Sequence, residues 1–437
     1  MTMPNNARSI SRRRSPGRVA TLAAIPLLTF GGWAMTSDHS GSIVQSSAQA
    51  EAFARSSNWD PQRKRFVNAL PERAPQIAPM LQKLMRGTDN ARPHVDLPVQ
   101  ARRAADFEEA PEDGLQLTWL GHSTTLVEID GTRVLLDPVW GERSSPFSWA
   151  GPQRFHAPPL PLSELLSLRV DAVAISHDHY DHLDQPTIEA LRAHVPLFVV
   201  PLGVGAHLER WGVDRARIVE RDWWQDVHVG TVRLVATPAR HFSGRSLIMA
   251  DRDRTLWSGW AIIGSEHRVY FSGDSAMFPG FAEIGRRLGP FDVTLLETGA
   301  YDELWADVHM GPEQAVLAHK LVRGKLYVPV HWGTFDLANH GWTEPVERAV
   351  AAAKRHGVKI ALPRPGTTLK PDDTPAEPWW PALPWQDASE SPVVSSGLPA
   401  WMLRELEVEA APSAMQHRTR TPMAPGVLVP VPALAVR

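Results

Sequence analysis

The chain contains no cysteine among its 437 residues. This absence excludes disulfide bonds, cysteine-ligated zinc, iron–sulfur clusters, a cysteine nucleophile and an acylated lipoprotein cysteine. Any metal site must therefore be built from histidine, aspartate and glutamate. Excess charge is also lacking, since the formal net charge is −3 and the isoelectric point is about 6.7. Without bulk positive charge, the chain is not expected to bind nucleic acid.

The first fifty residues differ in composition from the rest of the chain. An arginine-rich segment precedes an uncharged apolar run over residues 19–35, which is short for a membrane span and contains proline and glycine. Basic residues before a short apolar segment are typical of an export signal or anchor, and Ala48-Gln49-Ala50 has the form of a cleavage site. We expect an exported or membrane-anchored protein on the periplasmic side of the envelope. The alternative is a disordered basic tail on a cytoplasmic protein.

The composition divides the remainder into three parts. Residues 51–114 are polar and predict an N-terminal wrap, with a helix near residues 78–85. Residues 115–370 alternate between strand and helix patterns and predict the catalytic domain. Residues 371–437 are rich in proline, alanine and serine and predict a largely disordered tail. Within that tail, Trp379, Trp380 and Trp385 could still pack on the domain.

Hairpin signals come early in each half of the central region, and strand–helix alternation comes late. Strands are expected over residues 115–119, 124–129, 133–136, 170–175, 197–200, 217–219, 232–236, 246–249, 268–272, 293–297 and 326–330. Helices are expected over residues 185–193, 203–210, 281–287, 313–322 and 344–356. This order favours two mixed sheets with helices packed outside them.

One loop concentrates metal-competent side chains. The pattern His-x-His-x-Asp-His places His177, His179, Asp181 and His182 within six residues. An apolar β-branched run precedes the loop, and Asp184 follows as a plausible N-cap with Pro186 in the first helical turn. Imidazole nitrogens and carboxylate oxygens suit zinc, and two metals need more ligands than this loop supplies.

Three strand ends offer the missing ligands. His241 lies just beyond the strand at 232–236, Asp274 follows a Gly-Asp turn after the strand at 268–272, and His331 follows the strand at 326–330. Gly273 permits a tight backbone beside Asp274, which could bridge two metals. Each residue alone is more often structural, whereas together with the loop cluster they indicate a dinuclear centre. Asp178 should face away from it by alternation.

The order of these motifs resembles that of the metallo-β-lactamase superfamily. Further segments resemble the N-acylphosphatidylethanolamine-hydrolysing phospholipase D family over about residues 65–385, namely residues 119–123, 136–140, 144–147, 151–155, 223–224, 289–292, 299–301, 309–313 and 331–335. The resemblance implies an α/β fold, a four-layer αββα sandwich, with the site along one edge of its sheets. The termini have no counterpart in the family.

The resemblance also implies a ligand set. One Zn²⁺ would be held by His177, His179 and His241, and a second by Asp181, His182 and His331, with Asp274 bridging the two. Two zinc ions lower the pKa of a bridging water from about 15.7 towards about 7, which supplies a hydroxide nucleophile. His309 resembles a family histidine near the leaving group and is a candidate general acid or phosphate contact.

Other residues are expected to support the metal ligands or to contact the substrate. His122 and Asp137 are expected to brace metal ligands through hydrogen bonds. Tyr180 is expected either to orient substrate or to pack. An aromatic lip for lipid tails is expected from Trp140, Trp149, Trp223, Trp224 and Trp305, although core packing explains each of them equally well.

The resemblance implies a zinc-dependent phosphodiesterase that cleaves N-acylphosphatidylethanolamine to an N-acylethanolamine and phosphatidic acid, acting at a membrane surface. The first alternative is a lactonase or other ester hydrolase of the same fold, because one fold hosts many substrates. The second is a non-catalytic metal-binding envelope protein, which the complete ligand set disfavours.

Overall fold

The computed structural model describes residues 47–74, 76–372 and 374–410. The arginine-rich leader, its apolar run and residues 411–437 lie outside the described residues, so the expectations for them stay predictions. Ala48, Gln49 and Ala50 lie within helix α1 (Ser47–Arg55). Across the described ranges, no helix combines the length and apolar character needed to cross a membrane.

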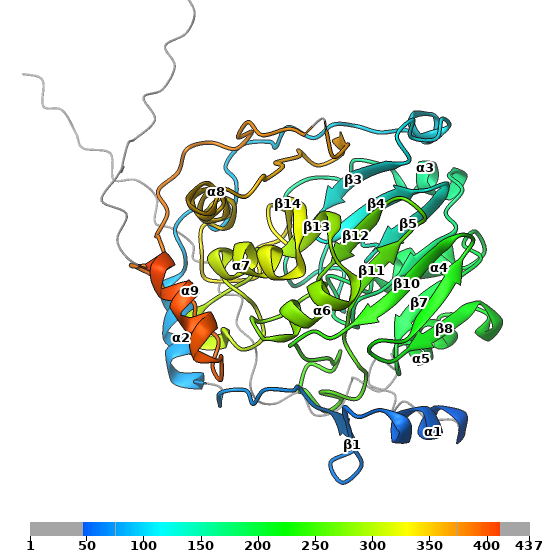
Figure 1. The fold of residues 1–437 in the computed structure, drawn as a ribbon, viewed down its shortest axis with the longest axis horizontal. Coiled ribbons are helices and arrows are strands. Elements are labelled where there is room, and N and C mark those ends of the chain that lie inside the picture. Colours follow the sequence, from blue (N-terminus) through cyan, green and yellow to red (C-terminus); the bar gives the residue numbers. More distant parts are fainter. Residues whose placement is uncertain (1–46, 75, 373, 411–437) are drawn as a thin grey trace, which may run out of the picture. The chain divides into compact units, whose positions relative to one another are not determined.

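The first sheet has seven strands in the order β15-β3-β4-β5-β6-β7-β8 (Figure 1). Its strands are β3 (Leu115–Gly121), β4 (Thr124–Ile129), β5 (Thr132–Leu136), β6 (Ala172–Ala174), β7 (Phe198–Pro201), β8 (Ile218–Arg221) and β15 (Thr368–Leu369). Asp130 and Gly131 form the predicted two-residue hairpin loop, since Ile129 pairs with Thr132. Strands β5 to β8 are parallel.

The second sheet has six strands in the order β14-β13-β12-β11-β10-β9. Its strands are β9 (Asp226–Val229), β10 (Val232–Thr237), β11 (Gly259–Ile263), β12 (Arg268–Phe271), β13 (Phe291–Glu297) and β14 (Gly324–Val330). Strands β9 to β12 are antiparallel, and β12 to β14 are parallel. Each sheet thus begins with hairpins and continues with parallel strands, as the sequence order predicts.

Alternating side chains build a four-layer sandwich. Leu234 and Ala236 of β10 belong to a core shared by both sheets, whereas Val235 between them packs in a core with the helices over the second sheet. Those helices are α6 (Gly280–Leu288), α7 (Pro312–Val322), α8 (Glu344–His356) and α9 (Ala400–Ala410). Helices α3 (Leu162–Ser167), α4 (Gln185–Leu191) and α5 (Gly205–Arg210) cover the first sheet. The αββα architecture is therefore confirmed (Figure 1).

The remaining elements are short. The wrap contains β1 (Trp59–Asp60), β2 (Arg65–Phe66), helix α2 (Ile77–Arg86) and a 3₁₀ turn at Ala104–Phe107. Further 3₁₀ turns lie at Arg215–Arg217 and Glu303–Trp305. At α4, the Asp184 side chain accepts a hydrogen bond from Thr187 N and Pro186 lies in the first turn, which confirms both helix-start predictions.

Two sequence predictions are wrong. Residues 246–249 form a turn, not a strand, because Asp251 accepts hydrogen bonds from the backbone N–H of Ser246 and Met249 adopts a φ of 56°. The part of the tail at 374–410 is packed, since Trp380, Val393, Leu398 and Met402 are buried. Trp379 packs against Trp332 and Trp380 is buried, as expected for the tryptophans of this segment, so aromatic burial overrides its polar composition.

Candidate metal centre

Every predicted ligand lies beyond the carboxyl end of a strand, and these ends meet along one edge of the sandwich. The loop of His177 to His182 follows β6 in the first sheet, while His241, Asp274 and His331 follow β10, β12 and β14 in the second. Strand ends of this kind are where α/β sheets place their ligands. The site therefore joins the two sheets.

The first group contains three imidazoles. His179 Nδ1 lies 2.8 Å from His177 Nε2 and 3.2 Å from His241 Nε2. His241 Nδ1 is bonded to the carbonyl oxygen of Val308 at 2.7 Å, which leaves Nε2 facing the cluster. The three ring nitrogens are close enough together to hold one metal ion.

The second group combines carboxylate and imidazole. Asp181 Oδ2 lies 3.4 Å from His182 Nε2 and 3.2 Å from His331 Nε2. His122 Nε2 lies 2.9 Å from the same oxygen, close enough for the bracing role, which stays a prediction. These four side chains also fit around one ion.

Asp274 connects the two groups. Its Oδ2 lies 3.1 Å from both His182 Nε2 and His331 Nε2. The same oxygen lies 3.8 Å from both His177 Nε2 and His241 Nε2. One carboxylate oxygen thus faces ligand atoms of both groups, which is the position of a bridging ligand.

The charges of the buried groups indicate that a cation belongs in this site. Burial lowers the pKa of His179 to about 4, so its imidazole is neutral at pH 7 and able to coordinate. Burial also disfavours charge on His331, yet Asp274 and Asp181 outweigh it and raise its pKa to about 10. His182 Nε2 is buried between the Oδ2 atoms of Asp274 at 3.1 Å and Asp181 at 3.4 Å. A divalent ion would supply the positive charge that these carboxylates otherwise draw from protonated histidines.

The backbone at the site is strained. His122, Asp137 and His331 have φ values of 51°, 37° and 64°, in the left-handed region that non-glycine residues seldom occupy. Gly273 has a φ of 55°, and a Cβ there would lie 2.6 Å from the Cβ of Ser176, which confirms the need for glycine. No sequence pattern indicates this conformation at the other three positions.

Two aspartates near the loop act on its shape. Asp137 Oδ2 lies 2.7 Å from His182 Nδ1 and accepts from the Ser176 hydroxyl at 2.6 Å, so its predicted bracing contact is present. Asp178 faces away from the cluster, as predicted, and accepts from the backbone N–H of Gly244 at 2.8 Å. Asp137 therefore fixes the ring orientation that presents His182 Nε2 to the site.

Replacing Asp137 by alanine is expected to weaken metal affinity by about 10- to 100-fold, because His182 loses the partner that orients it. Competition between the protein and a chromogenic chelator measures this change. Asp171→Asn is the matched control, since Asp171 lies at the other end of β6 and bonds the backbone N–H of Arg133. Equal affinities for the two variants would contradict the bracing role.

Glu297 is a site residue that the sequence prediction missed. It ends β13, its Oε2 accepts from the backbone N–H of Ser275, and its Oε1 lies 2.6 Å from His309 Nδ1. Burial and the Asp274 carboxylate raise the pKa of Glu297, while burial lowers the pKa of His309 to about 4. Because Glu297 engages Nδ1, His309 has Nε2 available to the adjoining cavity. Like Asp274, Glu297 comes at the end of an apolar strand, so the same sequence pattern would also have indicated Glu297.

A cavity of about 420 Å³ adjoins the cluster. Its polar wall includes His179, Asp181, Asp274, His309 and His331 from the site, together with Glu72, Arg73, Arg252 and Asp307. Its apolar wall includes Met80, Phe242, Met249, Leu304, Trp305 and Leu337. The wrap therefore forms part of the candidate substrate site, which its composition did not indicate.

The predicted aromatic lip is largely absent. Of its five tryptophans, only Trp305 lines the cavity. Trp140 donates to the carbonyl oxygen of Leu160 and Trp223 to that of Trp257, so both pack into the fold. Trp224 packs beside Arg287, whose guanidinium lies 4.1 Å from its ring centre. Trp149 is exposed but does not line the cavity.

Tyr180 packs and does not line the cavity. Its hydroxyl donates to the carbonyl oxygen of Arg245, and the Arg245 guanidinium lies 4.0 Å from its ring centre. Arg245 in turn donates to the carbonyl oxygens of Asp178 and Leu183. The structure thus favours the packing alternative, in which Tyr180 helps to hold the ligand loop.

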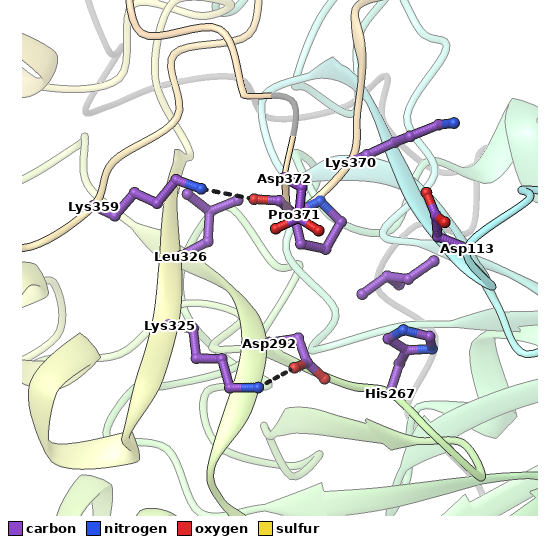
Figure 2. Close-up of a pocket in the computed structure, with 10 residues that line it drawn as sticks. Asp113, His267, Asp292, Lys325, Leu326, Lys359, Lys370, Pro371 and Asp372 are labelled. Atoms are coloured by element: carbon purple, nitrogen blue, oxygen red, sulfur yellow. Dashed lines mark hydrogen bonds and ion pairs between the residues drawn. The ribbon is translucent and has the colours of Figure 1, made fainter.

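A second cavity, of about 550 Å³, lies at the opposite ends of the strands (Figure 2). It is lined by Asp113, Leu115, His267, Asp292, Lys325, Leu326, Lys359, Lys370, Pro371 and Asp372. Lys325 is paired with Asp292 at 2.8 Å, and Lys359 donates to the carbonyl oxygen of Pro371. Although larger, this cavity shares no residue with the groups that fit a metal ion, so the smaller cavity is the candidate active site.

Comparison with known proteins agrees with this geometry. Residues 132–332 match the family model described as a beta-lactamase superfamily domain. The family match and the relatives show a metal-dependent hydrolase with the metallo-β-lactamase fold, with which the histidine–aspartate cluster agrees. The chain belongs to the β-lactamase superfamily.

The chain is similar to two curated relatives and to one solved structure. It is 39% identical over 253 residues to N-acyl-phosphatidylethanolamine-hydrolyzing phospholipase D 1 of Caenorhabditis elegans, covering 55% of this chain and 69% of that protein. It is 53% identical over 272 residues to an uncharacterized protein of Mycobacterium tuberculosis, covering 61% of this chain and 72% of that protein. A metallo hydrolase from Ignicoccus hospitalis aligns with a TM-score of 0.45 and 25% identity, covering 58% of this chain and 97% of that one.

Proposed function

We propose that the protein is a dizinc phosphodiesterase that hydrolyses N-acylphosphatidylethanolamine to an N-acylethanolamine and phosphatidic acid. The observation that carries this proposal is one cavity that joins the ligand cluster to two guanidinium groups and an apolar wall. A phospholipid has the matching parts, since an anionic phosphodiester joins apolar chains. The Caenorhabditis relative supports this substrate class.

Seven side chains would hold the metal ions. His177, His179 and His241 face one position, Asp181, His182 and His331 face the other, and Asp274 faces both. When bound, two zinc ions would activate water as the nucleophile and neutralise charge on the phosphodiester oxygens. Imidazole and carboxylate ligands favour zinc over softer metals.

The surrounding residues would bind the anionic substrate. Arg252 lies in the cavity wall, paired with Glu72 at 2.8 Å and stacked 4.4 Å from the centre of the Phe242 ring. Arg73 lies 3.7 Å from Asp307 in the same wall. Guanidinium groups recognise phosphate oxygens through paired hydrogen bonds, so these two side chains would orient the diester.

His309 would protonate the leaving oxygen as part of a proton relay. As the phosphorus–oxygen bond breaks, the neutral ring would give its Nε2 proton to the N-acylethanolamine oxygen, and Glu297, whose pKa is raised, would pass a proton to Nδ1. General acid catalysis of this kind requires a side chain within hydrogen-bond reach of that oxygen. His309 lines the cavity that would hold the substrate, which supports this role.

A substrate panel tests the proposal. Purified protein loaded with zinc is offered N-acylphosphatidylethanolamine, phosphatidylcholine, a lactone and bis-p-nitrophenyl phosphate, and metal is counted by mass spectrometry. We expect about two zinc ions per chain, hydrolysis of both the N-acylated lipid and the aryl diester, and a preference for the N-acylated lipid over phosphatidylcholine. Activity on the lactone alone would establish the ester-hydrolase alternative. No hydrolysis with full metal loading would favour the non-catalytic alternative.

A further inference from the structure

Exposed apolar side chains gather on two surface segments beside the mouth of the metal-site cavity. Six of the eleven large hydrophobic side chains that are exposed in the described part of the chain belong to these segments, namely Met80, Leu81, Met85, Leu247, Ile248 and Met249. Met80 and Met249 also line the cavity, so the two segments border it from the wrap and from the loop before β11. We call these six residues the apolar rim.

Helix α2 exposes Met80, Leu81 and Met85 at the surface. Met85 is 78% exposed and Leu81 is 48% exposed. Lys83, which lies between them in sequence, instead pairs with Asp302 at 2.9 Å and with Glu303 at 3.0 Å. A surface helix normally buries apolar residues and exposes its charges. Three large apolar side chains exposed on one short helix are unfavourable in water, which indicates that they are used for binding.

The second segment is a structured turn. Ile248 is 84% exposed and Leu247 is 70% exposed. Asp251 accepts hydrogen bonds from the backbone N–H groups of Arg245 and Ser246, and Met249 N donates to the carbonyl oxygen of Ser246. These hydrogen bonds hold Leu247 and Ile248 at the tip of the turn, so their side chains cannot be buried within the chain.

The charges around the rim favour an anionic lipid surface. Arg86 is exposed at the end of α2 and has no ion-pair partner among residues 47–74, 76–372 and 374–410. Arg73 and Arg252 lie inside the mouth, where they pair with Asp307 and Glu72, so the acids of this wall are neutralised. Aliphatic side chains beside arginines match a bilayer, where the chains enter the acyl boundary and the guanidinium groups contact phosphates.

We propose that the apolar rim is a membrane-docking surface that seats the cavity mouth on a phospholipid bilayer. The inference rests on the proposed function for its substrate, since a docked mouth would admit a lipid headgroup without removing its chains from the membrane. The rival occupants are a second copy of this chain and residues 1–46.

The absence of native cysteine allows a residue-specific test. Single variants Ile248→Cys and Met85→Cys are labelled with an environment-sensitive fluorophore in the full chain and mixed with phosphatidylcholine vesicles, with and without phosphatidylglycerol. Ser265→Cys is the matched control, since Ser265 is exposed in the turn beside His267 at the opposite ends of the strands. We expect a blue shift at positions 248 and 85, stronger with phosphatidylglycerol, and none at 265.

Each other outcome overturns the proposal. No shift at 248 and 85 excludes docking through the rim, even if a different segment binds the vesicles. A blue shift without vesicles that grows with protein concentration assigns the rim to a second copy of the chain. A blue shift without vesicles that does not depend on protein concentration assigns the rim to residues 1–46. Equal shifts at 248 and 265 indicate non-specific adsorption.

A second variant separates docking from chemistry. Replacing Leu247 and Ile248 together by serine should reduce hydrolysis of N-acylphosphatidylethanolamine in vesicles while bis-p-nitrophenyl phosphate hydrolysis is retained, because neither residue lines the cavity. A blue shift of the fluorophore on vesicles without hydrolysis of N-acylphosphatidylethanolamine would reject the proposed substrate and leave the docking surface standing. Hydrolysis of this lipid without a blue shift would reject the docking surface and leave the proposed substrate standing.

Discussion

Replacing Asp274 by asparagine is expected to lower hydrolytic activity by about 10³-fold, which corresponds to about 4 kcal/mol of lost transition-state stabilisation. The Oδ2 of Asp274 lies 3.1 Å from His182 and His331 and 3.8 Å from His177 and His241, so no other carboxylate oxygen in the described residues faces both groups. Asparagine is nearly the same size but carries no negative charge. Metal analysis by mass spectrometry should show fewer bound ions.

Asp292→Asn is the control for this experiment. Asp292 lies near the start of β13, at the opposite ends of the strands, and bonds Lys325. It should retain both metal and activity. An Asp274→Asn variant that kept its full metal content would contradict the assignment of Asp274 as a shared ligand.

Replacing His309 by alanine is expected to lower turnover of N-acylphosphatidylethanolamine by about 10²- to 10⁴-fold while metal content stays unchanged. The leaving oxygen of this substrate is a poor leaving group that needs a proton. Bis-p-nitrophenyl phosphate releases a stable phenolate, so its hydrolysis should fall far less. Initial rates on both substrates, with metal content measured in parallel, check this result.

Glu297→Gln should show the same dependence on the leaving group in a weaker form, because it alters the partner of His309 Nδ1 and leaves Nε2 in place. His267→Ala, in the cavity of Figure 2, should change neither rate. Equal losses on both substrates for His309→Ala would show that His309 supports the structure of the site and does not transfer a proton.

The sequence predicted the ligand-bearing edge well because one rule applied repeatedly. Short apolar strands followed by histidine or aspartate place side chains at a common edge, and the structure brings His241, Asp274 and His331 beside the loop of His177 to His182. Glu297 also ends an apolar strand, but a glutamate at the end of a strand pattern resembles an ordinary solvated residue, so the sequence prediction missed its place in the site.

Other features depend on contacts between distant segments and could not be predicted. Strand β11 begins with Gly259 and is defined by pairing with β10 and β12. Residues 246–249 have a strand-like composition, yet hydrogen bonds to Asp251 make them a turn. The cavity wall includes Glu72, Arg73 and Met80, which contact the site only because the wrap folds back over the sandwich. Tryptophan content likewise favoured an aromatic lip, whereas aliphatic residues occupy the mouth.

The division of the ligands between two sheets links catalysis to folding. Asp181 and His331 come from different sheets and are separated by 150 residues along the chain, yet they face one ion position. An ion bound there would fasten the two halves of a chain that has no disulfide to do so. Because such an ion favours the folded state over the unfolded one, its affinity is part of the unfolding free energy. Substitutions that weaken the metal ligands would therefore lower conformational stability. Because of this cost, evolution of a new substrate range would be restricted to substitutions in the wrap and at the cavity mouth.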